Sequence, residues 1–142
     1  AQVAPRSSLA ILLAEDNAVN QKVATHMLAR MGYTVDIANN GVEVLEALQH
    51  KSYDVILMDV QMPQMDGLEA TRLICERWPP EQRPYIVAMT AHALSGDAEK
   101  CIAAGMDDYI SKPVDRAKLD KVLKARQEIQ RNVSITNYST QS

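Results

Sequence analysis

Short apolar runs alternate along the chain with stretches in which apolar residues recur every three or four positions. A short apolar run is typical of a buried strand, whereas the longer spacing indicates a helix with one apolar face. We predict strands over residues 9–14, 33–38, 54–58, 85–89 and 108–111. We predict helices over residues 18–31, 41–50, 67–77, from 95 or 96 to 104, and from the cap Asp115 as far as Ile129, with Leu119, Val122 and Leu123 on the same face.

Capping residues mark several helix ends. Asp66 precedes the third helix and Glu69 stands three positions later, which is a variant of the capping box. Gly32 and Gly105 stand where a left-handed residue ends a helix. The prolines at 79–80 stop the third helix. In the first helix, apolar residues at spacings of four predict an apolar stripe: Val19, Val23, Met27 and Met31.

Five strands that are each followed by a helix predict an α/β fold with a parallel, doubly wound sheet. The crossover between parallel strands is right-handed, so it places helices on both faces of the sheet. In such open sheets the functional site lies beyond the carboxyl ends of the strands. Residues that follow the strands are therefore the first candidates for function.

Polar residues follow four of these strands. They are Glu15 and Asp16 after the first, Asp59 at the end of the third, Thr90 at the end of the fourth and Lys112 after the fifth. Two carboxylates about 4 Å apart repel each other by about 4 kcal/mol at an effective dielectric constant of about 20. Mg²⁺, which prefers oxygen ligands, relieves that repulsion and leaves room for a phosphate oxygen.

The same cluster predicts phosphoryl chemistry. Lys112 is suited to a phosphoryl oxygen, and the Thr90 hydroxyl can donate to another. Asp59 is the predicted nucleophile, because aspartate carboxylates accept phosphoryl groups in aspartyl-phosphate enzymes. Taken singly, each residue has an ordinary reading: Asp59 as a strand-end cap, Thr90 as a turn residue, Lys112 as a solvated lysine. Their joint position after successive strands favours the functional reading.

Composition and charge limit the classes of protein to which the chain can belong. The formal net charge of -3 and the pI of about 5.6 give no electrostatic reason to bind nucleic acid or an anionic membrane. The apolar run at 9–14 is too short to span a bilayer. Cys75 and Cys101 have no metal or CxxC spacing, so we expect reduced thiols and a cytoplasmic location. We expect residues 1–8 to form a linker or tail, 9–131 one domain and 132–142 a C-terminal tail.

Four motifs resemble the response-regulator receiver domain of two-component signalling. They are LLAEDN, VILMDVQMPQMDG, VAMTAHA and DDYISKPV, in order over about residues 9–130. The resemblance implies a flavodoxin-like fold with strand order 2-1-3-4-5. It implies Mg²⁺ (or Mn²⁺) held by the side chains of Asp16 and Asp59 and the backbone carbonyl of Gln61, with Glu15 acting through water. Glu15 departs from the commonest Asp-Asp pair of the family.

The resemblance also implies a mechanism and partners. Asp59 would take a phosphoryl group from a phosphohistidine, with Thr90 and Tyr109 as the switch pair and a cis Lys112–Pro113 bond. Gln61 and His92 would tune the lifetime of the phosphate. The sequences of the motifs are most like those of receivers in hybrid sensor histidine kinases. This likeness implies a kinase core in the same chain and a histidine phosphotransfer protein as partner. A receiver catalyses its own phosphorylation and dephosphorylation, and the sequence leaves open whether the chain is an enzyme beyond that.

Three other readings stay open at the level of sequence. One is a stand-alone response regulator. The second is a pseudo-receiver, which binds partners without phosphate chemistry. The third is a phosphatase or phosphotransferase with an aspartate nucleophile. Gln61 argues against this reading, because such an enzyme is expected to have a second aspartate at that position.

Overall fold

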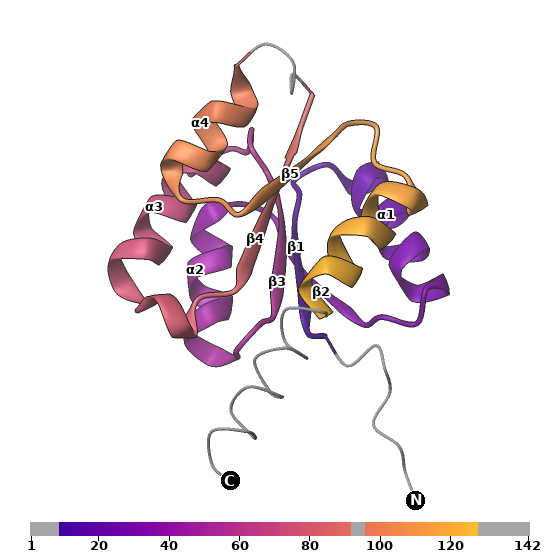
Figure 1. Ribbon diagram of the computed structural model, residues 1–142, viewed down its shortest axis with the longest axis horizontal. Helices are drawn as coiled ribbons and strands as arrows, with labels where there is room; N and C mark the ends of the chain where they lie inside the picture. Colours follow the sequence, from indigo (N-terminus) through magenta and orange to yellow (C-terminus); the bar gives the residue numbers. More distant parts are fainter. Residues whose placement is uncertain (1–8, 92–95, 128–142) are drawn as a thin grey trace, which may run out of the picture.

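Five parallel strands form one sheet in the computed structural model, which describes residues 9–91 and 96–127 (Figure 1). The strands are β1 Ile11–Ala14, β2 Val35–Ala38, β3 Val55–Asp59, β4 Tyr85–Thr90 and β5 Asp108–Ser111. The order β2-β1-β3-β4-β5 is the one that the sequence analysis expected. β3 therefore lies at the centre, with its apolar run buried on both faces.

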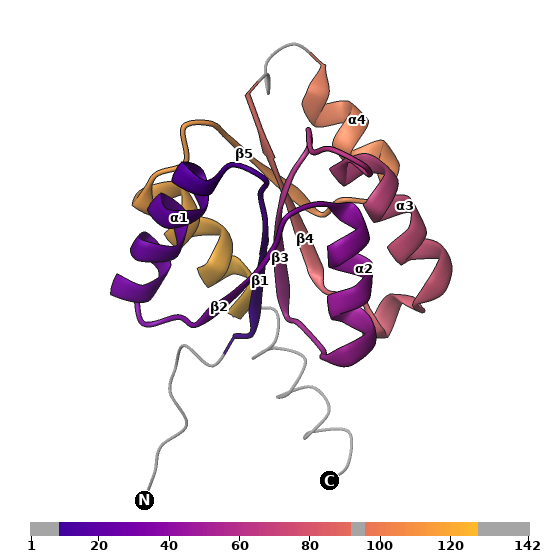
Figure 2. The same cartoon turned by 180° about the vertical axis from the view of Figure 1, so that it is seen from behind.

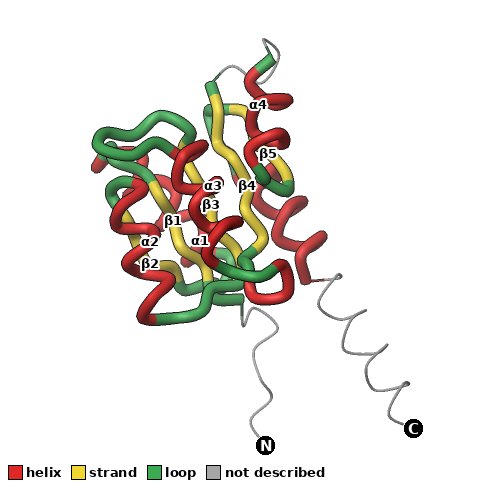
Figure 3. The backbone as a smooth tube through the Cα atoms, turned by 90° about the vertical axis from the view of Figure 1, so that its left-hand side faces the viewer, coloured by secondary structure: helices red, strands yellow, loops and turns green. Residues whose placement is uncertain are grey.

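Helices cover both faces of the sheet, as Figures 1 and 2 show from opposite sides. The helices are α1 Ala18–Arg30, α2 Gly41–His50, α3 Gly67–Arg77, the 3₁₀ turn η1 Pro80–Gln82, α4 Asp97–Ala104 and a last helix whose described part is 116–127. α1 and the last helix lie on one face, and α2, α3 and α4 lie on the other. Figure 3 shows the yellow strands between the red helices.

The alternation of side chains along each strand builds two hydrophobic cores. In β1, Ile11 and Leu13 face α1 and the last helix, whereas Leu12 and Ala14 face the other layer. The last helix joins the first core through three side chains: Leu119, Val122 and Leu123. This double burial explains why the central strands read as continuous apolar runs rather than as an alternating pattern.

The predicted helix ends agree with the structure at several positions. Asp66 accepts the N–H of Glu69 at 2.9 Å, so it caps α3 as expected. Asp115 caps the last helix by accepting the N–H of Lys118 at 2.9 Å. Gly105 has a φ of 113°, the left-handed conformation that a helix stop needs. Ile129 and the predicted tails 1–8 and 132–142 lie outside the described residues.

The predicted apolar stripe of α1 is wrong in its first half. Val19 and Val23 are 67% and 48% exposed, whereas Ala24 and Leu28 form the buried face. A step of four residues overshoots one helical turn by about 40°, so a stripe at this spacing winds away from the sheet. Only its last two members, Met27 and Met31, pack against the core.

Strand limits differ from the prediction by one or two residues. β1 and β2 begin two residues later than expected, because the ladder between them starts with Ile11 opposite Val35. β3 and β4 each extend one residue further, since Asp59 pairs with Met89 in the ladder. Thr90 likewise pairs with Ser111.

Among the described helices, none is long and apolar enough to cross a membrane.

Candidate functional site

Asp59 closes the central strand and lies in the interior, with only 5% of its surface exposed. One carboxylate oxygen, Oδ1, accepts the backbone N–H of Gln61 at 3.3 Å. The backbone next to it turns sharply into α3, because the N–H of Gly67 donates to the carbonyl of Val60 at 2.9 Å. The strand therefore delivers a carboxylate to the edge of the sheet and the turn fixes its orientation.

Glu15 and Asp16 join Asp59 at this edge. Ala14 pairs with Met58, so the residue after β1 lies level with the last residue of β3. Carboxylate oxygens of Glu15, Asp16 and Asp59 all lie within 4.8 Å of one another. Glu15 and Asp59 are buried, whereas Asp16 is exposed. The cluster therefore opens to solvent through Asp16.

The backbone around Glu15 is held from two sides. Its N–H donates to the carbonyl of Ala38 at 3.0 Å, and its carbonyl accepts the side-chain amide of Gln21 from α1. Its carboxylate accepts the N–H of Asn17 at 3.1 Å. Burial raises the pKa of the Glu15 carboxyl, and the nearby charge of Asp59 raises it too, whereas the Asn17 N–H and the Lys112 ammonium lower it.

Lys112 brings the positive charge that the sequence predicted. Its Nζ lies 3.1 Å from Oδ1 of Asp59 and 3.5 Å from Oε1 of Glu15. To reach them the side chain crosses over β4, because Lys112 follows β5 and β4 lies between β5 and β3. Its N–H donates to the carbonyl of Thr90 at 2.8 Å, and the Lys112–Pro113 bond is cis, as expected.

Thr90 and Asp59 line one small cavity of about 40 Å³. Asp59, Val60, Gln61, Met89, Thr90, Ala91, Asp97 and Lys112 form its walls. The Thr90 hydroxyl donates to Oδ2 of Asp97 at 3.4 Å. A carboxylate, a hydroxyl donor and an ammonium thus surround a space that a phosphoryl group could enter.

Tyr109 lies outside this cavity. It is on β5, opposite Ala88, and is 44% exposed. His92 lies outside the described residues. The structure brings together the rest of the predicted set, Glu15, Asp16, Asp59, Gln61, Thr90 and Lys112.

Sequence reasoning missed Asp97, the first residue of α4. It lies inside the helix predicted from 95 or 96 to 104, at a position to which the sequence pattern assigns no function. Its place seven positions after Thr90 was a usable signal, because the helix after a strand begins at the same edge as the end of that strand. Gln21 was missed for another reason, since it acts on a carbonyl that no sequence pattern marks.

The donor set suits a hard divalent cation. The three clustered carboxylates carry more negative charge than the Lys112 ammonium balances. All three offer oxygen ligands, which Mg²⁺ prefers, and the solvent opening at Asp16 suits an ion that keeps several waters. The residues present therefore fit magnesium.

A five-stranded, doubly wound sheet with an acidic cluster and a lysine at its carboxyl ends defines the receiver class of α/β domains. The model of the response regulator receiver domain family matches residues 11–124, and the chain belongs to this family.

Several relatives among known proteins are histidine kinases. The chain is 43% identical over 149 residues to Histidine kinase 5 of Arabidopsis thaliana, covering 86% of this chain and 16% of that protein. It is 36% identical over 116 residues to the signal transduction histidine-protein kinase BarA of Escherichia coli K12, covering 82% of this chain and 12% of that protein. The chain thus corresponds to a small part of these relatives, their receiver portion.

Solved structures agree with the fold. The receiver domain of the sensor histidine kinase PA1611 of Pseudomonas aeruginosa PAO1 has a TM-score of 0.77 at 42% identity, covering 84% of this chain and 98% of that one. That structure has a magnesium ion coordinated in its active-site cleft. The chemotaxis protein CheY4 of Vibrio cholerae has a TM-score of 0.74 at 27% identity, covering 82% of this chain and 97% of that one.

Proposed function

We propose that this receiver domain is the phosphoacceptor of a phosphorelay, in which Asp59 takes a phosphoryl group from a phosphohistidine. The observation that carries the proposal is the contact of Asp59 with Lys112 at 3.1 Å, inside a cavity that Thr90 also lines. The kinship with receivers of histidine kinases supports the same function.

The transfer is a displacement at phosphorus. A carboxylate oxygen of Asp59 attacks, the new bond is O–P, and the P–N bond to the donor imidazole breaks while that nitrogen keeps the electron pair. The Lys112 ammonium faces the charge that grows on the phosphoryl oxygens, and the Thr90 hydroxyl donates to one of them. Positioning and neutralisation of charge account for most of the rate in such reactions.

A divalent cation completes this site in our proposal. Mg²⁺, or Mn²⁺ in its place, would be held by the carboxylates of Asp16 and Asp59 and the carbonyl of Gln61, with Glu15 acting through a bound water. The oxygen-rich, partly solvated cluster supports this ligand set. The ion supplies a Lewis acid that neutralises charge on the acceptor and on the phosphoryl group.

Phosphorylation would act as a switch. By analogy with hydroxyl phosphates, it adds a charge of about -1.5 to -2 at Asp59. Thr90 would leave Asp97 to bond the phosphoryl group, and Tyr109 would turn inward from its exposed position on β5. A difference of a few kcal/mol between the two states is enough to shift the population. The face formed by α4 and β5 would carry the output.

The wider setting is proposed from the relatives. A hybrid histidine kinase would hold the kinase core in the same chain, and a histidine phosphotransfer protein would take the phosphoryl group onward. We propose a cytoplasmic location, which the free thiols of Cys75 and Cys101 support. Gln61 and His92 would set the phosphate lifetime. Profiling transfer between the domain and a panel of kinase cores and phosphotransfer proteins would identify the cognate pair by rate.

Incubation with acetyl phosphate and Mg²⁺ tests the acceptor directly. Intact-protein mass should rise by one phosphoryl group, and Asp59→Asn should abolish the rise because the nucleophilic oxygen is lost. Asp120→Asn, the same change at a carboxylate on the last helix, should leave uptake unaltered. Uptake that persists in Asp59→Asn would refute the assignment. Multiple turnover on phosphate esters would favour the phosphatase reading instead.

A further inference from the structure

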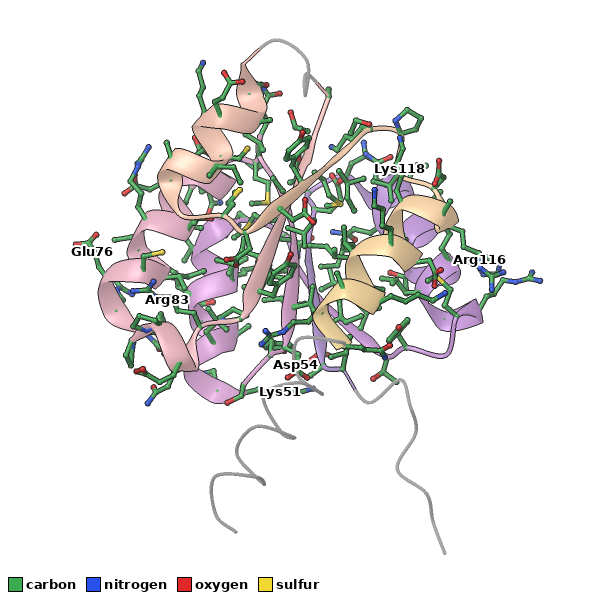
Figure 4. The ribbon with its side chains drawn as sticks, in the orientation of Figure 1. Lys51, Asp54, Glu76, Arg83, Arg116 and Lys118 are labelled. Carbon is green, nitrogen blue, oxygen red and sulfur yellow. The ribbon has the colours of Figure 1, made fainter. Side chains whose placement is uncertain are left out.

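Lys118 directs its whole hydrogen-bonding capacity at the short segment that carries Lys112. Its Nζ donates to the carbonyl of Ser111 at 3.0 Å, to the Ser111 hydroxyl at 3.2 Å and to the carbonyl of Pro113 at 3.1 Å. A lysine ammonium has three donors. Figure 4 shows Lys118 at the start of the last helix, beside the loop that follows β5, whereas Arg116 points outward.

The backbone of Lys118 is held in place by a helix cap and by the packing of its helix. Its own N–H donates to the capping carboxylate of Asp115 at 2.9 Å. The next residue, Leu119, is 0% exposed, and Leu123 one turn later is also 0% exposed. The helix that carries Lys118 is thus packed into the core. The hydrogen bonds of the Lys118 ammonium hold the loop in a fixed place relative to this helix.

The loop needs such support because it lies at the edge of the sheet. Among the strands that the structure describes, β5 pairs with β4 only, so the carbonyl of Ser111 has no further described strand beside it. A backbone bond also ties this loop to β4, from the Lys112 N–H to the Thr90 carbonyl at 2.8 Å. From this place Lys112 must reach across β4 to Asp59, so a small shift of its backbone moves the ammonium away from the acceptor.

We propose that Lys118 is a positioning residue for phosphoryl transfer: it holds residues 111–113 so that the Lys112 ammonium meets Asp59 and the incoming phosphoryl group. The proposal rests on the proposed function. Lys118 itself contacts no reacting atom, because all three of its observed partners belong to Ser111 and Pro113. The last helix is thereby coupled to the chemistry through one side chain.

The first test is the initial rate of phosphorylation by acetyl phosphate at saturating Mg²⁺. Lys118→Met keeps the apolar stem and removes the donors, so the rate should fall by about tenfold through misplacement of Lys112. The Mg²⁺ dissociation constant from calorimetric titration should not rise, because the proposed ligands come from the ends of β1 and β3 and withdrawal of the nearby ammonium charge favours a cation. Loss of Mg²⁺ affinity in parallel with the rate would indicate a general disturbance and overturn the proposal.

A double-mutant cycle separates positioning from support of the fold. In a Lys112→Met background, Lys118→Met should have no further effect on the rate, because the group that it positions is already gone. A second loss of similar size would show that Lys118 acts independently of Lys112, which contradicts the proposal. The residual rate is measurable over long incubations by intact-protein mass.

Two further variants complete the design. Lys124→Met makes the same change on the same helix, at an exposed lysine whose partner is Asp120 at 3.1 Å, and should leave the rate unchanged. Lys118→Arg keeps charge and donors, so it should retain more than about half of the rate and serves as the test if Lys118→Met fails to fold. A rate in Lys118→Arg as low as that of a folded methionine variant, or a matching loss in Lys124→Met, counts against the proposal. If the parent domain takes up no phosphoryl group at Asp59, the proposed function fails, which is a distinct result.

Discussion

Asp97 places a negative charge in the wall of a cavity that is proposed to receive a phosphoryl group. Its carboxylate also accepts the Thr90 hydroxyl at 3.4 Å, a contact that would compete with a bond from Thr90 to a phosphoryl group on Asp59. Both effects would oppose the proposed phosphorylation of Asp59. The Lys112 ammonium, which lies 3.1 Å from Asp59, would favour phosphorylation.

We therefore expect Asp97→Asn to accelerate phosphorylation by acetyl phosphate. The asparagine oxygen still accepts from Thr90, but the charge is gone, and removal of about 1 kcal/mol of screened repulsion corresponds to about a fivefold rate increase. The increase should shrink as salt is added. Glu99→Gln, at an exposed acid in the first turn of the same helix, should change the rate little. An unchanged or slower Asp97→Asn would show that its charge does not limit the reaction.

At the scale of elements, the contact between α3 and β3 explains the glycine in the motif MDG. Gly67 is the first residue of α3 and lies directly against the end of β3. A Cβ at this position would clash with the carbonyl oxygen of Asp59 and would stand 2.8 Å from Cγ of Met58. α3 can approach β3 this closely only because Gly67 has no side chain.

Gly67→Ala should lower the free energy of unfolding by about 1–3 kcal/mol, since the backbone must shift to accept the methyl group. It should also slow phosphorylation, because the atom that is pushed belongs to Asp59. Gly41→Ala is the matched control at the start of α2, where a Cβ would meet Met65 instead. We expect that control to lose stability while it keeps its phosphorylation rate, as measured by urea unfolding and mass. Equal rates in both variants would contradict the specific role of Gly67.

At the scale of the whole molecule, two hydrophobic cores pack on opposite faces of one sheet, and three carboxylates cluster at the carboxyl ends of its strands. The strands that supply the acids, β1 and β3, are neighbours at the centre of the fold. Mutual repulsion among Glu15, Asp16 and Asp59 therefore acts against the packing of the entire domain.

Mg²⁺ should accordingly raise the thermal unfolding temperature. A ligand that binds only the folded state stabilises it by about 2.7 kcal/mol at a concentration of 100 times its dissociation constant. The shift should vanish when the ion is chelated and be strongly reduced in Asp16→Asn, which removes the exposed carboxylate of the cluster. Sodium chloride at equal ionic strength is the control, and an equal shift with that salt would argue for screening rather than binding.

Local sequence patterns predicted much of this architecture. Apolar runs, helical spacing and caps such as Asp66 predicted the order of elements, and the limits of α2 and α3 agree with the prediction. The candidate site was predictable for the same reason, because residues that follow parallel strands arrive at one edge of the sheet. The least reliable feature was the stripe of α1, where several apolar residues compete for the buried face and only the packing decides between Ala24 and Val23.

The sequence by itself determined which residues stand after each strand, because that depends only on order along the chain and on the handedness of the crossovers. Only the tertiary structure decided which side chains meet across the gaps between elements. Asp97 reaches Thr90 and Lys118 reaches Ser111 because helices pack at particular angles against the sheet. Such contacts follow from the shape of the packed cores, which no local period encodes.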